Sequence, residues 1–514
     1  MKIFPKIARL LAFLAVLGMA VRSVAQAFTV LHTFSSTNSL GENSDGANPE
    51  AGLVLSGGTL YGAAFGGGDS GNGTVFRIET NGMNFTSMHS FEASVSFTYN
   101  FYGFQETGYT NADGIGPAST LLLSGNTLYG STTEGGPFFT AATANNGVYP
   151  TEAGTLFSMT LGGEFNTLYY FPERLAPYGT LTSSGSTLFG TTALAGDYGS
   201  VFSVGTQGTG LTTLYNFSYG SVTNDGFYPG SGLILSGNYL FGTTSGITIS
   251  SAGFGNNSGT IFAINLINSN YNTLYAFSYP GVSVYTNSDG MGPYGHLVLS
   301  GSRFYGTTCE GGLYDSGTIY AVNTDGSGFT NLHYFSLAAV DAVSGFATNS
   351  DGFDSLTALV LSGNTLYGTT LYGGTAGNGT VFAINTDGKG FTTLHSFDAG
   401  GINNLGIYTN SDGVYPQGDL TLAGNTLYGT TENGGTNGNG TIFSIPLGTV
   451  SSPAPQLGIT RSGNNLILTW PVSATGYTLQ SCTNLSSPVW TTVTGQFTVT
   501  NPIPSRRAFY RLSQ

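Results

Sequence analysis

The chain has 514 residues, of which 80 are glycine, 35 phenylalanine and 30 tyrosine, whereas charged residues make up only 7%. This composition excludes a charged disordered chain, because the aromatic residues supply ample apolar surface to bury. It also argues against a helix-rich enzyme, whose exposed faces are normally rich in Glu, Lys and Arg. Many glycines and aromatic residues with little charge favour short strands joined by tight turns.

Residues 1–27 have the features of a secretory signal peptide. Basic residues open the segment, a 12-residue apolar run covers 10–21, and Ala25-Gln26-Ala27 provides a small-x-small cleavage site. An uncleaved anchor is the alternative, but a run of 12 residues is short for crossing a bilayer. We expect cleavage before Phe28, no later membrane span, and a secreted, extracellular or cell-surface protein.

The charge of the mature chain excludes one class of partner. Cleavage removes four of the twelve basic residues and no acidic one, which leaves eight bases against 26 acids, a formal charge of −18. Nucleic-acid binding requires clustered Lys and Arg to neutralise phosphates, so eight scattered bases exclude it. An acidic surface with Lys389 as its only lysine suits cations and neutral sugars better than polyanions. Cys309 and Cys482 are isolated in the sequence, and we expect two thiols rather than a disulfide framework.

Seven copies of one motif divide the mature chain into repeats, numbered 1 to 7 by copy. The motif is Leu-Tyr-Gly or a close variant, at 60–62, 128–130, 188–190, 240–242, 304–306, 366–368 and 427–429. Each copy lies within four apolar segments of strand length, which in repeat 6 cover 359–364, 365–370, 379–385 and 391–397. Gly, Asn and Asp turns separate them, and this pattern predicts four antiparallel strands per repeat.

The two ends of the array favour closure into a ring. The Phe-Thr-x-Leu-His strand occurs first at 28–34, before any other repeat element, whereas repeat 7 ends after 440–445 without it. We therefore predict that the N-terminal strand completes the last sheet, which leaves no exposed edge at the seam. The expected fold is all-β: a seven-bladed β-propeller over 28–449, closed by the N-terminal strand.

The repeat unit resembles the GloVer tandem repeat of secreted bacterial proteins and, more loosely, kelch-type blades. Over about 28–446 the repeats keep one order of elements: Asp-Gly-x-x-Pro, Leu-Tyr-Gly-Thr-Thr-x-x-Gly-Gly, Gly-Thr-Val-Phe, Asp-Gly and Phe-Thr-x-Leu-His-x-Phe. The resemblance implies an extracellular protein, often with a variable, choice-of-anchor module at its end, and implies no activity. Repeat 3 departs from the pattern, because Pro172-Glu-Arg-Leu-Ala-Pro177 replaces the Asp-Gly turn.

A Pro-rich linker at 450–456 precedes a segment of different composition. Residues 457–514 hold both tryptophans and alternate as short strands, which predicts a small C-terminal fibronectin-like β-sandwich. A capping role and an anchoring or sorting role are both open for this module.

Two polar positions recur along the repeats. An Asp-Gly pair precedes the first strand of six repeats; it either forms a turn or contributes to a ring of carboxylates that holds Ca²⁺, although no EF-hand spacing is present. A second position, in the last strand, alternates between His and Tyr, which favours packing with a polar tip over a zinc site. We expect no metal site and no cofactor, with Ca²⁺ as the alternative. The aspartates are Asp45, Asp113, Asp225, Asp289, Asp351 and Asp412, and the ring residues are His32, His89, Tyr169, Tyr215, Tyr275, His333 and His395.

Two sets of long loops are expected on one face of the propeller, and they carry the candidate ligand-binding residues. Aromatic rings beside carboxylates are typical of sugar-binding surfaces. The alternative is that the long loops pack their own aromatic residues as small covers. The candidates are Tyr99, Phe101, Tyr102, Phe138, Glu134, Glu310 and Glu432.

No serine-hydrolase elbow, phosphate-binding loop or zinc-protease motif is present, so we assign no catalytic residue. We predict a monomeric, non-catalytic protein that binds a glycan or a surface protein through its loop-rich face. The alternative is an extracellular polysaccharide hydrolase or lyase that uses carboxylates of that face, although the sequence singles out no carboxylate pair. A purely structural envelope component is a third hypothesis.

Overall fold

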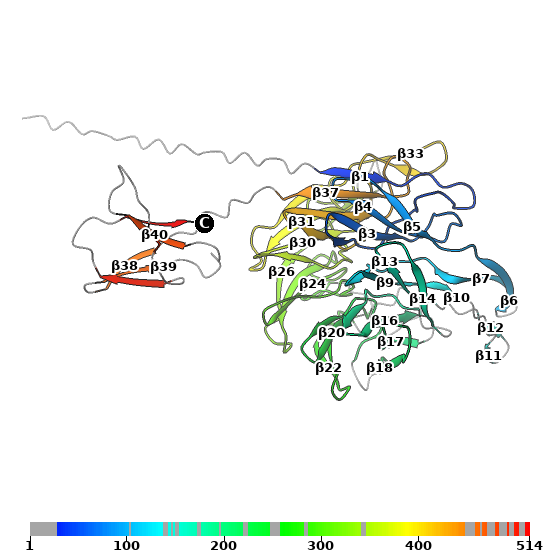
Figure 1. The fold of residues 1–514 in the computed structure, drawn as a ribbon, viewed down its shortest axis with the longest axis horizontal. Coiled ribbons are helices and arrows are strands. Elements are labelled where there is room, and N and C mark those ends of the chain that lie inside the picture. Colours follow the sequence, from blue (N-terminus) through cyan, green and yellow to red (C-terminus); the bar gives the residue numbers. More distant parts are fainter. Residues whose placement is uncertain are drawn as a thin grey trace, which may run out of the picture. The chain divides into compact units, whose positions relative to one another are not determined.

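The computed structural model describes most of the repeat array and parts of the C-terminal segment. The described residues are 28–101, 104–136, 142–144, 147–149, 154–171, 176–194, 197–218, 225–246, 258–281, 286–340, 346–447, 458–462, 465–469, 478–482, 491–492, 498–502 and 509–513. The expected signal peptide and linker lie outside these residues. The chain divides into two compact parts, Met1–Pro446 and Leu447–Gln514 (Figure 1). No helix occurs in the described ranges, and the regular structure is antiparallel strand, so the predicted all-β class is confirmed.

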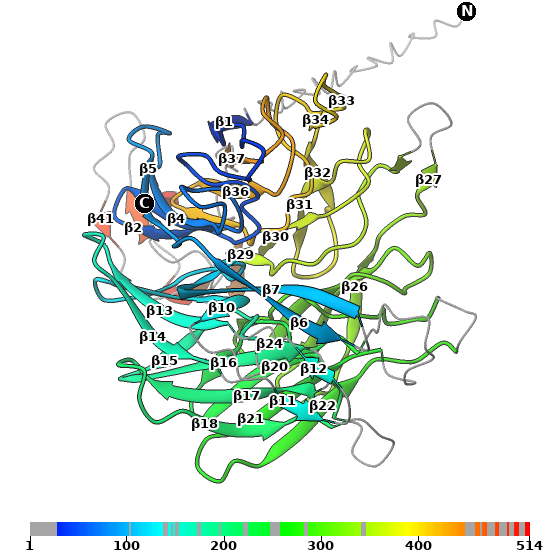
Figure 2. The same cartoon turned by 90° about the vertical axis from the view of Figure 1, so that its right-hand side faces the viewer.

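Seven sheets of the described N-terminal part have four strands each, and each sheet corresponds to one repeat (Figure 2). The short first strands are β2 (Val54–Ser56), β8 (Leu122–Ser124), β15 (Thr182–Ser184), β19 (Ile234–Ser236), β23 (Val298–Ser300), β29 (Val360–Ser362) and β35 (Thr421–Ala423). The second strands carry the Leu-Tyr-Gly motif and are β3 (Thr59–Ala64), β9 (Thr127–Thr132), β16 (Thr187–Leu194), β20 (Tyr239–Thr244), β24 (Arg303–Thr308), β30 (Thr365–Thr370) and β36 (Thr426–Thr431). The third strands are β4 (Thr74–Glu79), β13 (Thr155–Thr160), β17 (Asp197–Gly205), β21 (Thr260–Asn265), β25 (Thr318–Asn323), β31 (Thr380–Asn385) and β37 (Thr441–Pro446). The outer strands are β5 (Thr86–Ser90), β14 (Phe165–Tyr170), β18 (Thr212–Asn216), β22 (Tyr271–Ala276), β26 (Thr330–Tyr334), β32 (Thr392–Ser396) and, for repeat 7, β1 (Thr29–Thr33).

The outer strand of the repeat-7 sheet comes from the beginning of the described chain. β1 pairs antiparallel with β37, and Val30 lies opposite Phe443 while Thr33 lies opposite Thr441. The two strands lie side by side in both views of the fold (Figures 1 and 2). The pairing satisfies backbone groups of β37 that would otherwise form a free sheet edge.

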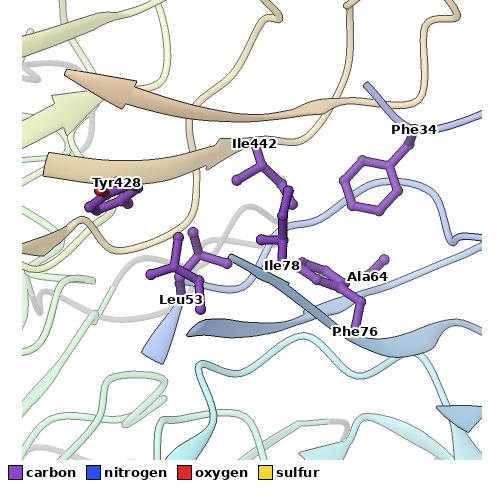
Figure 3. Packing of buried hydrophobic residues seen from close by; sticks show 8 residues of the cluster. Phe34, Leu53, Ala64, Phe76, Ile78, Tyr428 and Ile442 are labelled. Atoms are coloured by element: carbon purple, nitrogen blue, oxygen red, sulfur yellow. The ribbon is translucent and has the colours of Figure 1, made fainter. Parts of the chain in front are cut away.

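Hydrophobic side chains pack between consecutive sheets of the described repeats. The second and third strands are almost fully buried along their length, as in β3 and β4. Separate hydrophobic clusters join the sheets of repeats 1 and 2, 2 and 3, 3 and 4, 4 and 5, and 5 and 6. A further cluster joins repeat 7 to repeat 1, where Tyr428 and Ile442 pack with Leu53, Phe76 and Ile78 (Figure 3).

At six boundaries between consecutive sheets, the buried aspartate of an Asp-Gly turn contacts the preceding sheet. Its carboxylate accepts a hydrogen bond of 2.7–3.0 Å from the His or Tyr at the recurring position of the preceding outer strand. The ring of that His or Tyr stacks at 3.8–4.3 Å on an aromatic ring of the next sheet. We call this arrangement the aspartate junction; in repeats 5 to 6 it comprises His333, Asp351 and Phe391.

Burial raises the pKa of Asp351, but hydrogen bonds from His333 and Ser336 outweigh burial and hold it below its usual value. The same balance lowers the pKa of Asp45, which His32 and Ser35 contact. The recurring aspartates and the His and Tyr positions therefore act as structural contacts between sheets.

The glycine of the Asp-Gly turn is required by close packing as well as by backbone conformation. Gly290 has a φ of +93°, and a Cβ placed there would lie 2.1 Å from the Thr308 Oγ1 atom. Repeat 3 lacks the aspartate, and Leu211 occupies the place of the stacking aromatic ring beside Tyr169. Both elements of the aspartate junction are thus replaced together.

Smaller elements extend from the loops before the first strands and, in repeat 2, also from the loop between the second and third strands. A hairpin of β6 (Val95–Phe101) and β7 (Phe104–Ile115), with β10 (Glu134–Gly136) beside it, belongs to repeat 2. The other additions are β11 (Ala142–Ala144), β12 (Gly147–Tyr149), β27 (Ala339–Val340), β28 (Ala347–Thr348), β33 (Gly401–Ile402) and β34 (Tyr408–Thr409).

The described residues of the C-terminal part form two three-stranded sheets. The first holds β38 (Gly458–Ser462), β39 (Asn465–Thr469) and β42 (Thr498–Pro502), and the second holds β40 (Thr478–Cys482), β41 (Thr491–Thr492) and β43 (Phe509–Ser513). Cys309 and Cys482 are both buried thiols, as expected from the sequence.

Replacement of Tyr320 by phenylalanine is predicted to stabilise the protein. Tyr320 is fully buried, and its hydroxyl has no hydrogen-bond partner among the described residues. The other six repeats have Phe at this position (Phe76, Phe157, Phe202, Phe262, Phe382 and Phe443). Removing an unsatisfied buried hydroxyl is worth about 1–3 kcal/mol, and urea unfolding of Y320F measures the gain. A loss of stability in Y320F would show that the hydroxyl has a partner.

Replacement of Asp351 by alanine is predicted to destabilise the protein by about 1–3 kcal/mol, because the His333 ring and the N–H and hydroxyl groups of Ser336 lose their acceptor. The matched variant is His333→Tyr, which introduces the side chain that repeats 2, 3 and 4 have at this position. We expect H333Y to unfold close to the wild-type midpoint in the same urea titration. Equal effects of D351A and H333Y would contradict the proposed role of the aspartate junction.

Candidate functional site

A cavity of about 400 Å³ is lined by residues from all seven repeats. Most of them occupy three consecutive positions that follow the Asp-Gly-x-x-Pro turn and precede the first strand. The lining comprises Glu50, Ala118, Ser119, Thr120, Tyr178, Gly179, Thr180, Gly230, Ser231, Gly232, Tyr294, Gly295, His296, Cys309, Glu310, Asp354, Leu356, Gln417 and Asp419. We call this the shared cavity.

The repeat frame fixes the backbone that leads into the shared cavity. The third residue after each turn aspartate has a left-handed backbone in all six repeats that have the aspartate: Asn48, Gly116, Tyr228, Gly292, Asp354 and Tyr415. In repeats 3, 5, 6 and 7, a threonine that follows the Leu-Tyr-Gly motif or its variant donates to a carbonyl of the next repeat. Thr369 Oγ1 donates to the Pro416 carbonyl, and Thr430 Oγ1 donates to the Ala51 carbonyl, both at 3.0 Å. The side chains of the lining are therefore free to vary while their backbone stays fixed.

The carboxylate of Asp419 connects several repeats at this cavity. Its Oδ1 atom accepts from the Ala358 N–H at 2.8 Å, and its Oδ2 atom accepts from Thr120 Oγ1 at 3.2 Å. The same Oδ2 atom lies 3.5 Å from Nδ1 of His296. Thr120 also accepts from the Gly52 N–H at 2.9 Å. Residues of repeats 1, 2, 5, 6 and 7 thus meet around one carboxylate.

Asp354 and Glu310, two acidic side chains near Cys309, have raised pKa values. Burial, reinforced by the charge of Glu310, raises the pKa of Asp354 to about 7. Burial, followed by the charge of Asp315, also raises the pKa of Glu310. The Cys309 thiol has a raised pKa because of burial and these same two acids, and burial raises the pKa of Tyr294 to about 12.

A second acidic pair lies on another part of the lining. Burial, reinforced by the charge of Glu432, raises the pKa of Glu50 to about 7. Gln417 donates a hydrogen bond to Glu432 and itself lines the shared cavity. Near neutral pH the cavity therefore holds both protonated and ionised carboxyl groups, which donate and accept hydrogen bonds, respectively.

The structure separates the candidate ligand-binding residues that the sequence grouped together. Glu310 lines the shared cavity, and Glu432 borders it through Gln417. Glu134 is half-buried in β10 and is not part of the lining. Tyr99 and Phe101 lie in β6 of the β6–β7 hairpin, which we call the outer hairpin. Tyr102 and Phe138 lie outside the described residues.

Sequence reasoning missed the acidic residues Glu50, Asp354 and Asp419 and the approach of His296 to Asp419. The available signal was positional: Glu50 and Asp419 fall within the three positions that follow the Asp-Gly-x-x-Pro turn, and Asp354 occupies a variable position of that turn in repeat 6. Because the side chains at these positions differ from repeat to repeat, they do not stand out as a motif.

Other features of the described chain bear on metals and membranes. No group of three or more His, Cys, Asp or Glu residues with metal-binding geometry occurs in the described ranges. Within the same ranges, no helix has the length and apolar character needed to cross a bilayer.

Several solved structures share a likeness with the chain. Oligogalacturonate lyase from Vibrio parahaemolyticus aligns at 10% identity and a TM-score of 0.44, covering 83% of this chain and 95% of that one. A putative 6-phosphogluconolactonase from Bacteroides uniformis aligns at 14% and 0.40, covering 88% and 98%. The N-terminal domain of Nup159 aligns at 14% and 0.40, covering 81% and 95%. Among curated proteins, no significant match to the chain was found.

The sequence itself matches one family model. Two overlapping matches, over residues 137–345 and 250–455, together span more than half of the chain. They cover the Leu-Tyr-Gly motifs of repeats 3 to 7 and the turn aspartates Asp225, Asp289, Asp351 and Asp412. The chain belongs to the Gloeobacter/Verrucomicrobia repeat family.

Proposed function

We propose that the protein is a secreted or cell-surface, non-catalytic binding protein that takes a neutral sugar unit of a glycan into the shared cavity. The observation that carries this proposal is the lining: hydroxyl, amide and carboxyl groups from seven repeats converge on about 400 Å³. That volume suits a small polyhydroxylated group. Among the described residues, the lining includes no Lys or Arg, which disfavours phosphate and uronate ligands.

We also propose an architecture for the protein. Residues 28–449 form a seven-bladed β-propeller closed by β1, and the shared cavity is its axial opening. The cluster between repeats 7 and 1 and the contribution of every repeat to the lining support a closed ring. Residues 450–456 form a linker, and 457–514 form a β-sandwich for capping, anchoring or sorting.

We also propose that the protein is secreted. This proposal rests on the signal-like residues 1–27, the acidic mature composition and membership of the repeat family. We propose a monomer that meets its glycan, or a glycan-bearing surface protein, outside the cell.

The buried acids Glu50 and Asp354 support a binding role, because their carboxyl groups lower the stability of the folded state at neutral pH. A carboxyl group whose pKa is raised by folding binds more protons in the folded state than in the unfolded state. Its contribution to stability therefore falls as pH rises from its ordinary pKa of about 4 through the raised value near 7. Acids that lower stability at neutral pH are typical of sites retained for function.

The variant Asp354→Asn is predicted to be more stable than the wild type at about pH 8, where the buried carboxylate is ionised. We expect a rise in Tm of a few degrees that shrinks as pH approaches 4, where the acid is protonated in both states. Asp387→Asn is the control, because Asp387 is an exposed turn residue beside Lys389. A gain in Tm that did not depend on pH would contradict the assigned pKa of Asp354.

The variant Glu310→Gln is predicted to weaken sugar binding by about tenfold or more, because a hydrogen bond to a charged group is lost. Calorimetry with a neutral oligosaccharide selected on a glycan array measures this loss. Glu164→Gln, an exposed turn residue, is the matched control. If E310Q retained full affinity while combined alanine replacement of Tyr99, Phe101, Tyr102 and Phe138 abolished it, the ligand would bind at the outer hairpin instead.

A second candidate function is glycoside hydrolysis in the same cavity. It is favoured by one observation, the raised pKa of Asp354 beside Glu310, since glycosidases pair a protonated acid with a second carboxylate. Release of reducing ends from a neutral polysaccharide, abolished in Asp354→Asn and retained in Asp387→Asn, would favour hydrolysis over binding alone.

A further inference from the structure

A second cleft, of about 510 Å³, lies between the sheets of repeats 4 and 5. It is formed by the start of β20, the end of β21, the turn into β22, and the β25–β26 turn at Thr324 and Asp325. β19 runs from the shared cavity at Gly232 toward the turn before Tyr239, so the two hollows lie at opposite ends of the repeat-4 sheet. We call the second hollow the amide cleft.

An aromatic platform forms one side of the amide cleft. The Tyr239 side chain is 44% exposed, although it belongs to a sheet strand. Its ring stacks on Phe241 with a centroid distance of 5.9 Å, and Phe241 contacts Phe304 of repeat 5 at 4.9 Å. The buried rings support the exposed one, so the Tyr239 ring is held in place in the absence of ligand.

Four asparagines provide the polar side of the cleft: Asn265, Asn268, Asn270 and Asn272. Asn265 Oδ1 accepts from the Ile267 N–H at 2.8 Å, and Asn268 Oδ1 accepts from the Asn270 N–H at 3.1 Å. These bonds fix two of the amides within the turn. Primary amides both donate and accept hydrogen bonds, as the hydroxyl groups of a sugar require.

The repeat frame does not need Tyr239, Asn268 or Asn270, whereas Asn265 corresponds to Asn323 and Asn385 of repeats 5 and 6. Five of the other six repeats have Thr where repeat 4 has Tyr239, namely Thr59, Thr127, Thr187, Thr365 and Thr426. In repeats 5 and 6, Gly326 and Gly388 stand in place of Asn268, and Gly328 and Gly390 stand in place of Asn270. Repeats 5 and 6 thus form the same sheet and turn without the exposed tyrosine ring and the two turn asparagines, and repeat 4 departs from them at one edge.

We propose that the amide cleft is a binding site for a neutral saccharide, separate from the shared cavity. The C–H face of a pyranose ring stacks on Tyr239, and its hydroxyl groups bond to the asparagine amides. Asp325 is the single charged residue of the described lining, and its carboxylate already accepts from the Ser327 N–H and hydroxyl. Without Lys or Arg in the lining, the cleft is not suited to phosphate, sulfate or uronate groups.

The test uses the mature chain, a glycan array of neutral oligosaccharides, and calorimetry with the oligosaccharide that binds most tightly. Tyr239→Thr introduces the side chain that five other repeats have at this position, so the variant is expected to fold. It should weaken binding by about tenfold, because the stacking ring is lost. Tyr239→Phe keeps the stacking surface and should retain most of the affinity. Tyr279→Thr removes another exposed tyrosine of repeat 4, outside the lining, and serves as the control.

The alternative outcomes are distinct. Unchanged affinity in Y239T, or equal losses in Y239T and the Tyr279→Thr control, would overturn the proposed site. Loss of affinity in E310Q but not in Y239T would assign all sugar binding to the shared cavity and would likewise overturn it. An array on which no neutral oligosaccharide binds would contradict the amide cleft and the shared cavity together, whereas loss in Y239T alone would support the cleft and count against the cavity.

Discussion

A sheet of four short strands is stable in this protein only because both of its faces are covered by other sheets, and the aspartate junction sets how consecutive sheets meet. The buried carboxylate accepts hydrogen bonds from the preceding outer strand, while the ring that donates to it stacks on the next sheet. One residue therefore connects a turn, an outer strand and a neighbouring sheet. Six aspartates of the described chain are buried acceptors of this kind.

This arrangement separates structural positions from variable ones. The outer strands and the Asp-Gly turns repeat the same contacts, and where repeat 3 loses the aspartate it also loses the aromatic partner. In repeats 1, 4, 6 and 7, a threonine of the preceding repeat donates to a backbone carbonyl at or beside the three positions that follow the turn, so the side chains there are free to differ. Glu50, His296 and Asp419 are such side chains, and they give the shared cavity its chemistry. The exposed ring of Tyr239 shows the same freedom at the opposite end of a sheet.

Much of the fold could be predicted from the sequence because its determinants are local and repeated. Alternation of apolar residues, Gly-containing turns and the phase of the 28–34 strand indicated the four-stranded sheets and the pairing of β1 with β37. The candidate site could not be predicted to the same extent. Asp419 meets Thr120, His296 and Ala358, which occupy the same repeat position but are far apart in the sequence and differ in residue type. The raised pKa values of Glu50 and Asp354 depend on burial and on a second acid nearby, and neither is visible in a repeat pattern.

The central claim is that the strand at 28–34 completes the last sheet and thereby closes the ring. The most direct measurement compares the thermal unfolding of three mature chains: the wild type, a chain that begins at Ser35, and a transplanted chain. In the transplanted chain, Phe28–Phe34 follows Pro446 through a copy of the Thr386–Gly390 turn of repeat 6 and precedes Leu447. The account predicts that the truncated chain loses cooperative unfolding at the wild-type Tm and that the transplanted chain recovers most of it. A truncated chain that unfolds with the wild-type Tm and cooperativity would contradict closure by this strand.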